Sequence, residues 1–126
     1  MKISFDAFKD EGTAPIYQQI LLYIKRGAVA GTIRDGDELP SRRMLSALLG
    51  INPNTVQKAF RLLEEEGLAV SHTGAASIMT LDAHKIEQLR RELLTGDIRG
   101  LTVALKRTGV SCEEAVRLIE KYWDEE

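Results

Sequence analysis

The chain has 126 residues, a formal net charge of −2 at pH 7 and 44% apolar residues. This length can bury one modest core or two small lobes, and no stretch approaches the roughly 18 consecutive apolar residues of a membrane span. The start, MKISFDAFKDEG, lacks the apolar segment of a secretory signal. The single cysteine excludes an intramolecular disulfide framework. We therefore predict a cytoplasmic protein, and its net acidity excludes coating DNA by charge alone.

The first elements in chain order are a short N-terminal segment and a helix over residues 15–30. Apolar and polar residues alternate in ISFD, residues 3–6, which fits a strand or an arm, including an arm that packs on a partner subunit. Ile16, Ile20 and Ile24 repeat every four residues and predict the helix. We expect this helix to complete a three-helix core with the two that follow.

The next part of the chain contains start and stop signals for two short helices joined by a tight turn. Ser41 is suited to cap the first helix, because its hydroxyl can accept a free backbone N–H, and Gly50 can end it in the left-handed conformation. Asn52 is suited to cap the second helix, with Pro53 at its first position and Gly67 after its end. A β-hairpin follows. The pattern predicts a winged helix-turn-helix, which places one helix in the DNA major groove.

The second of these helices has one apolar face and one face of amides and cations. Helical spacing predicts a buried face formed by Val56, Ala59, Phe60 and Leu63. The opposite face carries Asn54, Gln57, Lys58 and Arg61. Amides can read adenine edges, while Lys and Arg can contact guanine or phosphate. Residues 41–61 hold four cations, Arg42 and Arg43 included, and no acid, and the acidic run 64–66 begins where the helix should leave the DNA. This favours DNA reading over an ordinary solvated face.

The string LPSRRMLSALLGINPNTVQKAFRLLEEEGL resembles the signature of the GntR family of bacterial transcription regulators, and the NPNTVQKA core is similar to its YtrA-like subfamily. The resemblance covers residues 15–81 well. It implies that Arg43 contacts the DNA backbone or a base and that Ser41 lies near a phosphate. It places further residues at or near the groove, namely Asn52, Asn54, Thr55, Gln57 and Lys58. It also implies control of nearby transporter genes and of the regulator's own gene.

The wing departs from the family pattern. That pattern usually has a basic residue followed by Gly-x-Gly-Thr-Phe-Val, whereas residues 71–79 read SHTGAASIM here. The turn glycine, Gly74, is kept, but the second glycine, the aromatic residue and any Arg or Lys are missing. Because minor-groove reading relies on inserted cations, we expect this wing to add less affinity than is usual. His72 is a weak candidate for a phosphate contact, stronger when protonated, and is otherwise an exposed residue at a strand end.

After the wing, Asp82 predicts the N-cap of a helix over residues 83–108. Gly96 and Gly100 interrupt its apolar spacing, each at a cost of about 1 kcal/mol, so the pattern allows two helices but narrowly favours one. Ser111 opens a capping box for a last helix. Its interior face is predicted to consist of Ala115, Val116, Ile119, Tyr122 and Trp123.

These elements predict a mainly α fold with a small β-hairpin, in which residues 1–82 form the winged helix-turn-helix and residues 83–126 a helical dimerisation or effector region. An apolar tail of this kind cannot form its own core, so a two-fold homodimer is its simplest closed solution. In such a dimer, the two helices that enter the major groove, one from each subunit, would meet half-sites about 34–36 Å apart. The alternative is a monomer whose tail folds back. Two helices leave little room for a small-molecule pocket, so the question of whether an effector binds stays open.

Other chemistry receives little support from the sequence. Cys112 at a helix start permits a redox role, but base rates favour a buried packing cysteine. His72, His84 and Cys112 have no metal-site spacing, and no nucleophile–base pattern or phosphate-binding loop indicates an enzyme or a cofactor. We predict a sequence-specific DNA-binding regulator, a repressor on a palindromic operator. The alternative is a winged-helix protein-interaction module, which the cation-free wing mildly favours.

Overall fold

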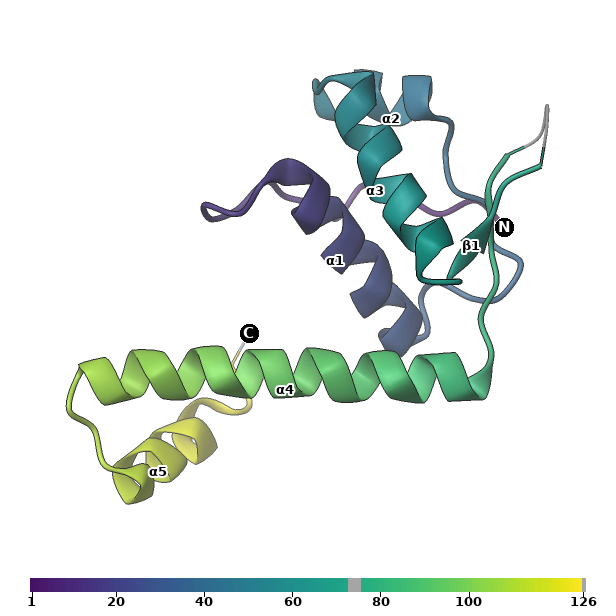
Figure 1. Cartoon of the computed structure of the whole chain (residues 1–126). Helices are drawn as coiled ribbons and strands as arrows, with labels where there is room; N and C mark the ends of the chain where they lie inside the picture. The colour runs from purple at the N-terminus through teal and green to yellow at the C-terminus, as the bar shows by residue number, and fades with distance from the viewer. Residues whose placement is uncertain (73–75, 126) are drawn as a thin grey trace. The chain divides into compact units, whose positions relative to one another are not determined.

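The computed structural model describes residues 1–72 and 76–125, and this part of the chain contains five α-helices and one two-stranded hairpin (Figure 1). The predicted fold class, mainly helical with a small hairpin, is confirmed. The chain divides into two compact units, Met1–Arg90 and Arg91–Glu126. The functional boundary expected after residue 82 stays a prediction.

The first unit contains the three predicted helices of the winged domain. They are α1 (Ile16–Ala30), α2 (Arg42–Leu49) and α3 (Pro53–Glu65). The Ser41 Oγ accepts the backbone N–H of Met44 at 3.0 Å, and the Asn52 Oδ1 accepts that of Asn54 at 2.8 Å, so both predicted N-caps are confirmed. Gly50 ends α2 at φ +67°, where a side chain would be strained.

The core of this unit lies between the helices. α1 and α2 both pack on α3, and the predicted apolar face of α3 is buried, with Val56, Ala59 and Leu63 fully inaccessible. α1 contributes Ile20 and Ile24, which are equally inaccessible. This packing fixes the direction in which the opposite, polar face of α3 points.

The hairpin and the N-terminal segment lie next to each other through residue Glu38. β1 (Ala69–Val70) pairs antiparallel with β2 (Ile78–Met79). Glu38 forms one bridge to Ile78 and another to Lys2, and the Ile3 N–H donates to the Glu38 carbonyl at 2.8 Å. Ile3 is buried. The N-terminal segment, for which a strand or an arm was expected, is therefore a short extended segment packed on its own chain.

The first turns of α4 (Ala83–Arg107) belong to the same unit. The structure has one continuous helix here, as the sequence narrowly favoured. Asp82 Oδ1 accepts the Lys85 N–H at 2.8 Å and thereby caps it. The Lys85 ammonium donates to the carbonyls of Gly67 at 2.7 Å and Thr80 at 3.1 Å. These bonds fasten the start of α4 to both sides of the hairpin.

The second unit consists of the rest of α4 and of α5 (Cys112–Tyr122), which Ser111 caps by accepting the Glu114 N–H at 3.2 Å. The predicted interior of α5 is wrong for the single chain. Ala115 is buried, but the other four predicted interior residues are exposed: Val116, Ile119, Tyr122 and Trp123. They are exposed because two helices enclose too little volume to bury a full apolar face.

Cys112 is also exposed, so the expectation of a buried cysteine is wrong. It opens the first turn of α5, one turn ahead of the packed residue Ala115. Within residues 1–72 and 76–125, none of the helices combines the length and apolar character that crossing a membrane requires.

Candidate nucleic-acid interface

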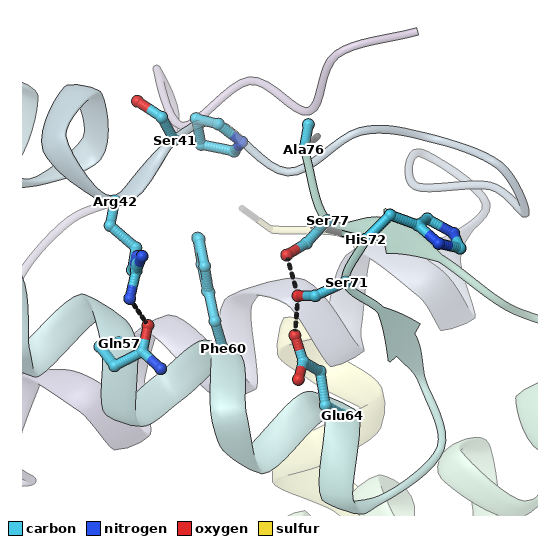
Figure 2. A pocket seen from close by; sticks show the side chains of 10 residues that line it. Ser41, Arg42, Gln57, Phe60, Glu64, Ser71, His72, Ala76 and Ser77 are labelled. Atoms are coloured by element: carbon cyan, nitrogen blue, oxygen red, sulfur yellow. Dashed lines mark hydrogen bonds between the residues drawn. The ribbon is translucent and has the colours of Figure 1, made fainter. Parts of the chain in front are cut away.

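A groove of about 660 Å³ opens in the first unit between the start of α2, one side of α3 and the hairpin (Figure 2). Its lining comprises Pro40, Ser41, Arg42, Gln57, Phe60, Glu64, Ser71, His72, Ala76 and Ser77. Four residues predicted to contact DNA are therefore brought together here: Ser41, Arg42, Gln57 and His72. They come from three separate stretches of the chain, which only the packing of α2, α3 and the hairpin unites.

The two cap residues of the helix pair each keep a hydrogen-bond donor available; Ser41 lines the groove and Asn52 is exposed at the start of α3. Ser41 and Asn52 each use a side-chain oxygen to accept a backbone N–H. The hydroxyl hydrogen of Ser41 and the amide N–H groups of Asn52 are left to donate. Thr55 is half-buried in the first turn of α3. Such donors at the start of a helix suit the phosphate oxygens of nucleic acid.

Arg42 and Gln57 join α2 to α3 across the groove. The Arg42 Nη1 donates a hydrogen bond to the Gln57 Oε1 (Figure 2). Gln57 is half-buried, whereas Asn54, one turn earlier on α3, is exposed. The sequence placed both amides on one polar face but contained no sign that an arginine of the preceding helix would hold one of them.

The other three cations of the predicted set differ in how firmly they are held. The Lys58 ammonium lies 4.0 Å from the centroid of the Tyr17 ring, a cation–π contact with α1. The Arg61 Nε lies 3.7 Å from a Glu65 carboxylate oxygen, and both side chains are more than half exposed. Such a surface pair contributes little and can exchange for a phosphate.

Arg43 is exposed and has neither a hydrogen bond nor an ion pair with the described part of the chain. It is therefore the cation of this surface that an anionic ligand can engage without breaking a contact.

The wing is braced by a carboxylate and two serines that sequence reasoning missed. The Ser71 hydroxyl donates to Glu64, and the Ser71 and Ser77 hydroxyl oxygens lie 2.8 Å apart (Figure 2). Glu64, the first residue of the acidic run that is expected to begin where α3 leaves the DNA, lines this groove. The sequence contained no pairing register that would identify them; in the structure, the two serines flank the Val70–Ile78 pair and meet there.

The structure describes one of the two predicted wing contacts. His72 is exposed and lines the groove. Gly74 lies outside the described residues. The described wing residues that line the groove are serine, histidine and alanine, so any cations in this groove come from the helices.

Comparisons with known proteins agree on one family. Residues 16–78, half of the chain, match the family described as "Bacterial regulatory proteins, gntR family". The chain is 31% identical to the HTH-type transcriptional repressor YtrA of Bacillus subtilis over 86% of this chain and 79% of the relative.

Two solved structures are also similar. A GntR family transcriptional regulator from Listeria monocytogenes superposes with a TM-score of 0.77 at 31% identity, covering 89% of this chain and 98% of that one. The structure described as AraR(DBD) in complex with operator ORE1 superposes with a TM-score of 0.51 at 25% identity, covering 57% of this chain and 88% of that one.

Proposed function

The chain belongs to the GntR family of bacterial regulatory proteins and is a DNA-binding transcriptional regulator; from this premise we propose that it is a repressor that binds a two-fold symmetric operator as a homodimer. A similar protein of Bacillus subtilis is named as a repressor, and a structural relative is described in complex with an operator. Repression would follow from occupancy, because a bound dimer blocks the DNA that it covers.

The observation that carries this proposal is the groove between α2, α3 and the hairpin. Ser41, Arg42 and Gln57 line it, and the exposed residues Asn54 and Arg43 lie on the same two helices. We assign DNA contact to the full predicted set, with α3 in the major groove and α2 on the backbone. The cations of this surface would neutralise phosphates, so binding should weaken as salt rises.

The homodimer is proposed from the second unit. It exposes large apolar side chains on both of its helices and at the end of the second, including Leu94, Ile98, Ile119 and Trp123. A second copy of this chain would bury them and would present two reading helices to two half-sites. A regulator of this kind works on the chromosome, which places it in the bacterial cytoplasm. The resemblance to YtrA-like regulators suggests its own gene and neighbouring transporter genes as targets.

Fluorescence anisotropy on DNA from upstream of the regulator's own gene tests the proposal, with scrambled DNA of equal length as the control and a series of salt concentrations. We expect specific binding to exceed nonspecific binding by about 10³-fold or more, with an affinity that falls as salt rises. Equal and weak binding to both DNAs would contradict it and would favour a winged helix that binds protein instead.

A paired variant separates these two functions. The double change Lys58→Glu with Gln57→Ala should abolish specific DNA binding while the dimer persists in sedimentation. Neither residue belongs to the buried face of α3, but Lys58→Glu gives up the contact with Tyr17, so a thermal unfolding curve must accompany the binding measurement. A matched control is Lys106→Glu with Gln88→Ala on α4, which repeats both changes outside the groove. Loss of DNA binding in both variants would count against a role for this face.

A further inference from the structure

Three of the side chains proposed to face the operator share one property: each has a side-chain oxygen that already accepts a hydrogen bond within the protein. The Ser41 hydroxyl oxygen and the Asn52 carbonyl oxygen accept backbone N–H groups. The Gln57 carbonyl oxygen accepts from Arg42. What these residues still present to a ligand is mainly O–H and N–H, so this part of the surface is complementary to acceptors.

This property matters most for Gln57, because an amide can read two different base patterns. Bidentate reading of adenine needs both ends of the amide, since Nε2 donates to N7 while Oε1 accepts from the N6 amine. Guanine presents two acceptors, N7 and O6, and no donor at that edge. With Oε1 turned to Arg42, Gln57 has its Nε2 donors left for the base, and the remaining N–H groups of Arg42 lie beside them.

We infer that Arg42 is a positioning residue that sets the base preference of Gln57, so that Gln57 selects guanine rather than adenine. The inference rests on the proposed function, because it requires a specific operator. Asn54 makes the contrast within the same helix. It is exposed, and its side-chain amide has no hydrogen bond with the described part of the chain, so both of its ends stay available for adenine.

The alternative arrangement is that Arg42 acts only as a cation near a phosphate. It would then add affinity to every sequence equally and would leave base preference unchanged. Arg43 supplies the matched control for that role. It is the adjacent residue on α2, carries the same charge, and is exposed without a partner in the described part of the chain.

The test is selection of bound sequences from a randomised double-stranded DNA library by the full-length protein and by three variants. Gln57→Ala identifies the operator position that Gln57 reads, because preference is lost there. At this position the unchanged protein should favour guanine over adenine by about tenfold. Arg42→Ala should shift the preference towards adenine by a similar factor. Arg43→Ala should weaken binding to all selected sequences without changing this preference.

A base analogue supplies the second measurement. Replacing the selected guanine by 7-deazaguanine removes the N7 acceptor and should weaken binding of the unchanged protein about tenfold, but that of Gln57→Ala little. Arg42 is exposed at the first position of α2, where Ala is a good helix former. A thermal unfolding curve for each variant establishes that it is folded.

The outcomes are distinct. Adenine selected opposite Gln57 by the unchanged protein, or a guanine preference that survives Arg42→Ala, overturns the inference while leaving the regulator intact. A library from which the unchanged protein selects no sequence overturns the proposed function itself.

Discussion

The two compact units of this chain differ in how far their apolar residues are buried. In Met1–Arg90, residues from α1, α2, α3, the hairpin and the first turns of α4 enclose a core that includes Ile24, Leu45 and Leu63 at 0% exposure. In Arg91–Glu126, Ala115 is buried, while Trp123 is 76% exposed. The first unit buries or partly buries most of its apolar residues within itself, whereas the second leaves most of them on its surface. Under the proposed function, recognition and assembly therefore depend on different units and can be altered separately.

The largest effect should follow from damage to the first core. Leu63→Ala leaves a cavity at a fully inaccessible position and should lower the free energy of unfolding by about 2–5 kcal/mol. The same change at Leu94, which is 48% exposed in the single chain, should cost about 1 kcal/mol or less when the protein is dilute enough to be monomeric. Urea denaturation followed by circular dichroism measures both. Equal costs would break the comparison between the two units.

The next effect concerns assembly. Ile119→Glu puts a charge into the exposed apolar face of α5 and should weaken the proposed dimer by about 30-fold or more, the effect of an interface change of 2 kcal/mol. Analytical ultracentrifugation over a concentration series measures it. Arg117→Glu is the control, because residues 117 and 119 lie about 200° apart on a helix. The first unit should remain folded in both variants, and a dimer unaffected by Ile119→Glu would contradict the assignment of this face.

A smaller effect is expected from a single cation of the recognition surface. Arg43→Ala should lower operator affinity about 3- to 10-fold and reduce the slope of log affinity against log salt by about 1, because one phosphate contact is lost. Anisotropy titrations at several salt concentrations measure both quantities. Arg107→Ala, in the last turn of α4, removes the same charge elsewhere and should leave the slope unchanged. An identical change of slope in both variants would point to net charge alone.

The smallest effect should come from the wing, and it is a gain. Ala76 is exposed and lines the groove, so Ala76→Arg adds a cation that the wing lacks. We expect affinity to rise about 2- to 5-fold at low salt, with a slope steeper by about 1. Ala76→Gln, a long uncharged side chain, is the control. Equal gains in both variants would mean that bulk, and not charge, strengthens the contact.

The sequence predicted those features whose causes are local. Ser41, Asn52 and Asp82 cap helices through bonds to the second or third residue along the chain, so their spacing alone identifies them. The continuity of α4 was harder to predict, because Gly96 and Gly100 weaken the helix without breaking it.

Features that depend on distant parts of the chain were not predicted. The Arg42–Gln57 bond requires the crossing of α2 and α3, and the Lys58 contact with Tyr17 requires the packing of α1 on α3. No spacing rule contains such information, because it arises only when the core sets the distance between helices. The exposure of Cys112 was mispredicted for a related reason. The frequency with which cysteine is buried, averaged over all proteins, carries no information about which turn of this helix is packed.

The bridges that join Glu38 to Lys2 and to Ile78 also affect the order in which this part of the fold can form during synthesis. During synthesis at 5–20 residues per second, the first extended segment waits roughly 2 to 7 seconds before its partner at residue 38 has been made, and about as long again for the hairpin. Throughout that interval the Ile3 N–H lacks its partner, the Glu38 carbonyl, whereas Phe5 already has its aromatic neighbours Phe8 and Tyr23. The extended segment is thus made well before the residues whose backbone bridges hold it in place.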